Sequence, residues 1–181
     1  MNHNSMNPDR NKASTPDNSQ RKPEGRYIVE GGYKIDRSCL YYKEHTWVRL
    51  KEGDAEGKTE GNTATVGLTD FAQKEMGAIS MADLPEPGDD VVAGKPFGTV
   101  ESGKWVQKLY SPCTGVVKAV NKEAVFSSSI INTDPYGKGW LIEVVLSERI
   151  EREKKEMLMS PEEYARYCLT EQERIRKGER R

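Results

Sequence analysis

Cysteine and histidine are scarce in this chain of 181 residues. Its three cysteines, Cys39, Cys113 and Cys168, are dispersed without a CxxC spacing, and two histidines are too few for a conventional structural zinc site. We therefore expect reduced thiols and a cytoplasmic protein. A nucleophilic pair of Cys113 with His45 is an alternative, but no local motif supports it and free cysteines are usually small buried hydrophobes.

The chain also lacks a charge excess and long apolar runs. A net charge of −1 leaves no basic surplus for phosphates, which argues against nucleic acid as a partner. The apolar runs are too short to span a membrane or to form the core of a signal peptide. A mean hydropathy of −0.81 is too polar for a chain that is globular throughout, so part of it should be solvated tail.

The composition divides the chain into three parts. Residues 1–26 are rich in Asn, Ser, Pro, Asp, Lys and Arg and are predicted to be a disordered tail. A transit peptide is the alternative there, although aspartates and prolines interrupt any amphipathic helix. Residues 27–170 are predicted to form one domain, and residues 171–181 a charged C-terminal extension.

Short β-type segments alternate with turn formers through most of the domain. After residue 27 the pattern predicts strands within residues 40–50, 63–68, 78–84, 91–94, 97–102, 105–110, 115–120 and 140–146. A spacing of about ten residues is typical of a small β-sandwich or barrel. Residues 132–139 are rich in turn formers and are expected to be an ordered loop.

Helix signals occur twice. Thr69 offers an N-cap for a short helix over residues 71–76, which Gly77 closes. Near the C-terminus, Ser160 and Glu163 have the spacing of a capping box around Pro161. This second helix should dock through Tyr164, Tyr167 and Cys168 and fray from Glu171 onward.

The most informative position is Lys104, which follows Gly103 between two strand-like segments. Gly in the first loop position favours a type II′ hairpin turn. A lysine at such a tip would have its side chain in solvent and would suit an enzyme that modifies amines. The plain alternative is a solvated lysine that discourages edge pairing. Glu101 before it and Trp105 directly after it favour a modified lysine.

Several separated motifs resemble the H protein family of the glycine cleavage system. They are Glu44–Val48, Gly67–Gln73, Leu84–Asp89, Pro96–Ser102, Tyr110–Pro112, Gly115–Val117 and Ile131–Trp140. Each motif is weak alone, but their common order over residues 40–163 is specific. The resemblance implies a mainly β, lipoyl-domain-like fold, a flattened sandwich of two small antiparallel sheets with a short helix and a C-terminal helix.

The resemblance also implies the site. Lys104 would carry lipoic acid in amide linkage, loaded by a lipoate ligase or lipoyl transferase that recognises Glu101 and Gly115. Ser102, Gly103 and Trp105 would form the turn and flank the arm. His45 would lie near a cleft that receives the loaded arm, although a packed strand residue is the more common role for such a histidine.

By the same resemblance, the chain is expected to be a non-catalytic carrier. We expect a monomer, because carriers that visit several enzymes gain from being monomeric. It would shuttle an aminomethyl intermediate between glycine decarboxylase, aminomethyltransferase and dihydrolipoyl dehydrogenase. The chain catalyses nothing itself: no carboxylate pair, Ser-His arrangement or phosphate-binding glycine loop stands out in it.

Three alternatives stay open. The family usually has Val before the lysine and a small residue after it, so Gly103 and Trp105 point to a lipoate-binding sulfur carrier whose partners are subunits of a heterodisulfide-reductase-like sulfur-oxidation complex. A biotinyl carrier is disfavoured because no methionine adjoins Lys104. An unmodified scaffold of the same fold is the third.

Overall fold

The computed structural model describes residues 1, 25–51 and 62–179. The predicted tail of residues 1–26, and with it the transit-peptide alternative, therefore lies almost entirely outside the described residues. Arg26 is described, and its Nε donates to the carboxylate of Asp36 at 2.9 Å, so the folded domain already includes this residue. No helix within the described ranges is long and apolar enough to cross a membrane.

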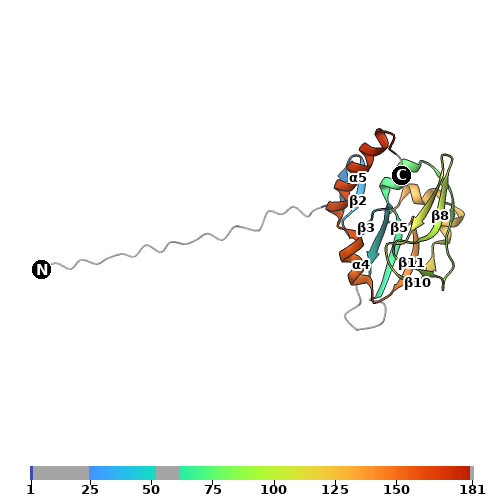
Figure 1. The fold of residues 1–181 in the computed structure, drawn as a ribbon, viewed down its shortest axis with the longest axis horizontal. Coiled ribbons are helices and arrows are strands. Elements are labelled where there is room, and N and C mark those ends of the chain that lie inside the picture. The colour runs from blue at the N-terminus through green and yellow to red at the C-terminus, as the bar shows by residue number, and fades with distance from the viewer. Residues whose placement is uncertain (2–24, 52–61, 180–181) are drawn as a thin grey trace.

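The described strands form three antiparallel sheets (Figure 1). The N-terminal hairpin consists of β1 (Tyr27–Glu30) and β2 (Tyr33–Asp36). A seven-stranded sheet has the order β12-β3-β4-β5-β11-β10-β7. Its strands are β3 (Leu40–Tyr42), β4 (Thr46–Leu50), β5 (Thr63–Leu68), β7 (Asp90–Val91), β10 (Gly115–Val120), β11 (Trp140–Leu146) and β12 (Leu158–Met159). The third sheet contains β6 (Ile79–Asp83), β8 (Pro96–Ser102) and β9 (Val106–Tyr110).

The two predicted helices are confirmed with their caps. In α1 (Asp70–Met76), the Thr69 hydroxyl accepts the Ala72 amide at 3.3 Å, and Gly77 ends the helix with a φ of 79°. In α5 (Pro161–Arg176), the Ser160 hydroxyl accepts the Glu163 amide and the Glu163 carboxylate accepts the Ser160 amide. A mainly β fold of antiparallel sheets with a short and a C-terminal helix is therefore confirmed.

Other expectations need correction. Among the described residues, three further helices occur that the periodicity did not indicate: α2 (Lys122–Phe126), α3 (Ser129–Thr133) and α4 (Ile150–Met157). The last two residues of α3 belong to the segment that was predicted to be a loop. The helix α5 does not fray at Glu171, because that side chain is buried and its carboxylate pairs with Arg174 at 2.9 Å.

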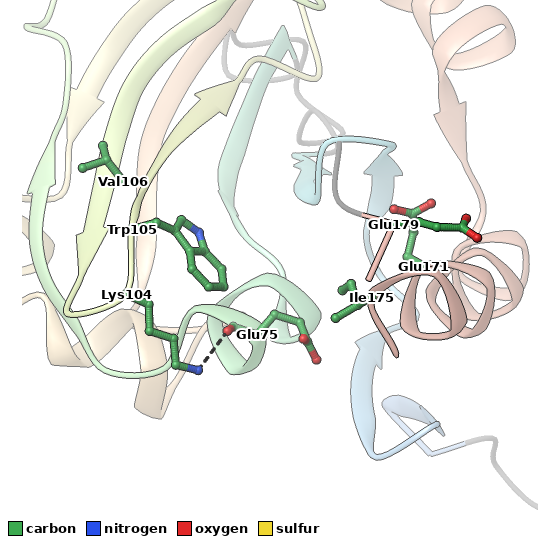
Figure 2. Close-up of a pocket in the computed structure, with 7 residues that line it drawn as sticks. All are labelled: Glu75, Lys104, Trp105, Val106, Glu171, Ile175 and Glu179. Atoms are coloured by element: carbon green, nitrogen blue, oxygen red, sulfur yellow. Dashed lines mark hydrogen bonds between the residues drawn. The ribbon is translucent and has the colours of Figure 1, made fainter. Parts of the chain in front are cut away.

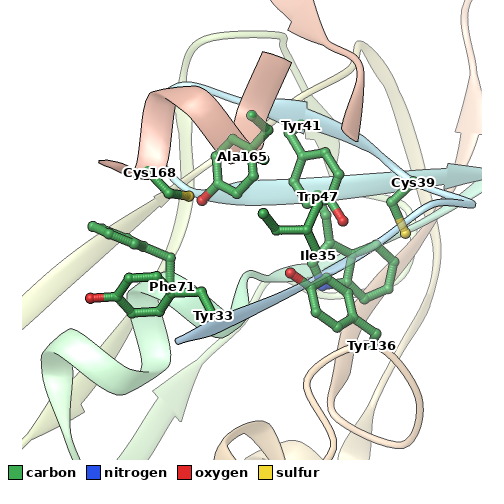
Figure 3. Packing of buried hydrophobic residues seen from close by; sticks show 10 residues of the cluster. Tyr33, Ile35, Cys39, Tyr41, Trp47, Phe71, Tyr136, Ala165 and Cys168 are labelled. Carbon is green, nitrogen blue, oxygen red and sulfur yellow. The ribbon is translucent and has the colours of Figure 1, made fainter. Parts of the chain in front are cut away.

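An aromatic cluster joins the large sheet, the N-terminal hairpin and α5 (Figure 3). Trp47 is fully buried at its centre, and its indole N–H donates to the Leu68 and Pro135 carbonyls at 3.0 and 3.1 Å. The indole lies directly against Gly67, where an added Cβ would collide with the ring. Cys168 of α5 is buried in the same cluster. The cluster therefore fixes α5 beside the hairpin and α1.

Candidate functional site

Ser102 shapes the tip of the β8–β9 hairpin. Its hydroxyl accepts the amides of Lys104 at 3.2 Å and Trp105 at 3.5 Å, while its own amide donates to the Trp105 carbonyl at 3.1 Å. Gly103 does not have the positive φ that the first position of a type II′ turn requires. The predicted turn type is therefore wrong, because a serine hydroxyl here organises the loop amides.

Lys104 is exposed at this tip (Figure 2). Its Nζ donates to the Glu75 backbone carbonyl at 3.3 Å and lies 5.9 Å from the centre of the Trp105 ring. Among the described residues, Lys104 forms no ion pair. A long hydrogen bond to an exposed carbonyl is a weak restraint, so the amine is accessible to a modifying enzyme.

A groove of about 620 Å³ adjoins Lys104. It is lined by Glu75, Lys104, Trp105, Val106, Glu171, Ile175 and Glu179. In Figure 2 the hairpin residues lie on one side, the α5 residues on the other, and Glu75 of α1 between them. Trp105 and Ile175 give the groove apolar walls next to Lys104. These walls fit the hydrocarbon chain of a lipoyl arm.

Glu101 lies on the outer face of the three-stranded sheet, because its neighbour Val100 on β8 is fully buried on the inner face. It pairs in register with Met81 on β6 and with Val106 on β9. Directly paired residues of antiparallel strands share a face, so the carboxylate stands between two apolar side chains. Met81 and Val106 are 47% and 58% exposed. Met81, Glu101 and Val106 together form an apolar surface with one negative charge beside the hairpin tip.

Gly115 is not brought to the tip. It begins β10, beyond the far end of β9, and β9 alone is 5 residues long, or roughly 17 Å. Gly115 is buried between β7 and β11, and an added Cβ would collide with the Val145 carbonyl oxygen. The glycine is required there by close strand packing.

His45 does not line the groove beside Lys104. Its Nδ1 lies 2.8 Å from the Tyr164 hydroxyl, and its ring stacks on Phe71 at 4.6 Å. Its φ of 64° places it in the left-handed region at the turn between β3 and β4. His45 is thus a packed residue at the edge of the aromatic cluster.

Cys113 does not form a nucleophilic pair with His45. The thiol is fully buried in a different apolar cluster, beside the valines of β5 and β11. Burial raises the pKa of Cys113 to about 12, which keeps it a thiol at neutral pH.

Sequence reasoning missed the residues of α1 and α5 that line the groove. Glu75 and Glu171 carry no local motif, and Ile175 lies in the part of the C-terminal helix that was expected to fray. Their common wall results from the packing of α5 against the N-terminal hairpin, which no short-range pattern shows.

A stiff β-hairpin that presents one lysine beside an apolar groove defines a covalent carrier protein. The glycine cleavage H-protein model matches residues 39–171. The glycine cleavage system H protein of Rubrobacter xylanophilus is 46% identical over 133 residues, which cover 74% of this chain and 94% of that protein. The one from Carboxydothermus hydrogenoformans is 41% identical over 139 residues, covering 77% and 98%.

A solved structure agrees with these relatives. The crystal structure of a glycine cleavage system H protein from Mycobacterium marinum superposes with a TM-score of 0.60 at 35% identity, covering 72% of this chain and 96% of that one. The chain therefore belongs to the glycine cleavage H-protein family.

Membership of this family establishes the general function of the chain. The chain is a non-catalytic carrier that holds a lipoyl group on a lysine and shuttles an aminomethyl intermediate within the glycine cleavage system. The comparisons give no support to sulfur carriage, so the flanks Gly103 and Trp105 do not indicate another cargo. They also rule against the biotinyl carrier.

Proposed function

We propose that Lys104 is the lysine that carries the lipoyl group. The observation that supports this most directly is its exposed amine at the apex of a β-hairpin, where the described residues offer it one long hydrogen bond, to the Glu75 carbonyl, and a contact with the Trp105 ring. Acylation removes the positive charge but leaves one N–H on Nζ, which can still donate to that carbonyl. The bond therefore can orient the arm without blocking its attachment.

The bound lipoyl group supplies an exposed, strained disulfide, the reactive kind. The residues of this chain bind and shield it. Trp105 and Ile175 provide apolar walls on opposite sides of the groove, and Lys104 lies at its edge. A tethered apolar arm has a high effective concentration next to such walls. We assign this groove as the cleft that receives the arm, in place of the predicted surroundings of His45.

The loading enzyme, a lipoate ligase or lipoyl transferase, approaches from the outer face in this proposal. On the inner side, α1 and α5 border the groove, whereas on the outer face Glu101 stands between the exposed side chains of Met81 and Val106. Glu101 would be read directly as a charge between two apolar contacts. The burial of Gly115 supports an indirect role, through the packing of β10.

The proposed partners of the loaded carrier are glycine decarboxylase, aminomethyltransferase and dihydrolipoyl dehydrogenase, and the proposed state is a cytoplasmic monomer. Three free, buried cysteines agree with a reducing compartment. We retain residues 27–170 as the carrier domain and residues 171–181 as its extension, with the modification that the helix α5 continues into that extension as far as Arg176.

The test is lipoylation of the full chain. Wild type, Lys104→Arg and Lys108→Arg are incubated with lipoate ligase, ATP and lipoate and analysed by intact mass and peptide mapping. Lys108 is a matched control because it is an exposed lysine on β9, in the same hairpin as Lys104. We expect one lipoyl increment on wild type and Lys108→Arg and none on Lys104→Arg. An increment that persists in Lys104→Arg would contradict the assignment.

A further inference from the structure

The family match begins at residue 39 and ends at residue 171. The N-terminal hairpin of β1 and β2 and the end of α5 from Gln172 onward lie outside it. These two segments contact each other, since α5 packs on both strands of the hairpin. We propose that the hairpin positions the groove beside Lys104, with Tyr33 as the positioning residue. The inference rests on the proposed attachment of the arm to Lys104.

The turn of the hairpin is fitted closely to α5. Gly31 and Gly32 form the two-residue loop, and both have positive φ, at 59° and 87°, as a type I′ turn requires. A Cβ added at Gly31 would lie 3.2 Å from Gln172 Oε1 and from Leu169 Cδ2. The Gln172 amide donates to the Gly31 carbonyl at 3.5 Å. The close approach of Gly31 to α5 therefore fixes the spacing between the hairpin turn and the helix.

Tyr33 connects α1 and α5, the two helices that border the groove. Its hydroxyl donates to Glu75 Oε1 at 2.7 Å and accepts from Gln172 Nε2 at 3.2 Å. Glu75 belongs to α1 and Gln172 to α5, so one hydroxyl connects both helices. The side chain is only 5% exposed, and its ring lies 4.7 Å from that of Phe71.

The hairpin is anchored to α1 by two further bonds. The Lys34 amide donates to Asp70 Oδ2 at 2.7 Å, and Lys74 Nζ donates to the Gly32 carbonyl at 2.7 Å. These two bonds and the Tyr33–Glu75 bond all join the hairpin to α1. The hairpin therefore cannot move away from α1 without breaking them.

The consequence concerns the groove directly. Glu75 lines it and holds Lys104 Nζ through its backbone carbonyl, whereas Ile175 lines it from the turn of α5 that follows Gln172. The Tyr33 hydroxyl thus sets the separation between the attachment point and the opposing apolar wall. Loss of this hydroxyl should loosen the groove and expose the arm while the domain stays folded.

The test measures the accessibility of the arm and uses lipoylated full chain whose increment on Lys104 is verified by mass. The disulfide is reduced with a phosphine, and the rate at which iodoacetamide alkylates the arm thiols is followed on the Lys104 peptide. Removing one hydrogen bond should raise the rate in Tyr33→Phe roughly fivefold. Gln172→Ala, which leaves the Tyr33 ring in place, should raise it in the same direction.

The matched control is Tyr27→Phe, a tyrosine of the same hairpin whose hydroxyl is not part of the Glu75 network. The arm thiols of Tyr27→Phe should be alkylated at the wild-type rate. Free dihydrolipoamide should be alkylated at the same rate whichever variant is present. Thermal unfolding of each variant shows that the domain is folded during labelling. Wild-type rates in both Tyr33→Phe and Gln172→Ala would overturn the positioning role alone. Absence of the lipoyl increment on Lys104 would overturn the attachment proposal as well.

Discussion

Glu101 stands on the outer face of the hairpin, with Met81 and Val106 on either side. An enzyme that acylates Lys104 must place the tip in its own active site and therefore meets this face. A carboxylate between two apolar residues offers such an enzyme one charged hydrogen bond inside a hydrophobic contact.

We expect Glu101→Gln to slow lipoylation roughly tenfold, because the loss of a charge-assisted hydrogen bond costs more than that of a neutral one. Initial rates of lipoate transfer with a fixed amount of ligase measure this. Glu148→Gln removes an exposed carboxylate beyond β11 and should load at the wild-type rate. Equal rates for both variants would remove Glu101 from the recognition surface.

Around Lys104 the local sequence was enough to indicate the hairpin tip. A glycine and a lysine between two β-type segments predict a hairpin tip, and the structure has that tip. The turn type was wrong because the hydroxyl of Ser102 binds two loop amides, which a pattern of φ preferences does not include.

The helix α5 is the element on which the far wall of the groove depends. Its capping box satisfies amides at the N-terminus of the helix, and hydrogen bonds from the Ser160 amide and hydroxyl lower the pKa of Glu163. We expect Ser160→Ala to lower the free energy of unfolding by about 1 kcal/mol. Urea denaturation followed by circular dichroism measures the loss.

Ser127→Ala is the control for the capping prediction. Ser127 is an exposed serine at the C-terminal end of α2, where a hydroxyl does not receive the first helical amides. Its free energy of unfolding should stay within about 0.5 kcal/mol of wild type. If both variants unfold like wild type, the cap does not contribute to stability.

Among whole elements, those with a long period or an explicit cap were predictable. Except for β12, which was not predicted, the strands of the two larger sheets follow from alternation, and the helices α1 and α5 follow from Thr69, Gly77 and Ser160. The helices α2 and α3 have only 5 residues each, too few to produce a 3.6-residue period. Asn121 accepts the Glu123 and Ala124 amides, and this cap was the one signal that could have indicated α2.

For the molecule as a whole, Asp36 ties the N-terminal hairpin to the large sheet. Its fully buried carboxylate accepts from Arg26, from Arg49 of β4, and from the Ser38 amide and hydroxyl. Burial by itself would raise the pKa of Asp36, but these donors outweigh burial and lower it. The carboxylate therefore stabilises the fold at neutral pH.

We expect Asp36→Asn to lower the free energy of unfolding by about 2 kcal/mol at pH 7. Because the pKa is lower in the folded than in the unfolded chain, the contribution is full above an unfolded pKa of about 3.9 and is lost as the pH falls below it. Urea denaturation of both proteins between pH 7 and pH 3 should show their difference shrinking in acid. A difference that is constant with pH would contradict the role of the charge.

The lysine at the hairpin tip, the succession of strands along the chain and the helix caps follow from residues that are neighbours in sequence, because turns, caps and alternation are short-range effects. The groove does not. Tyr33 meets Glu75 across 42 residues and Gln172 across 139, and His45 meets Tyr164 across 119. Such contacts exist only once the hairpin, α1 and α5 bury their apolar sides together, so the folded arrangement alone places the wall that faces Lys104.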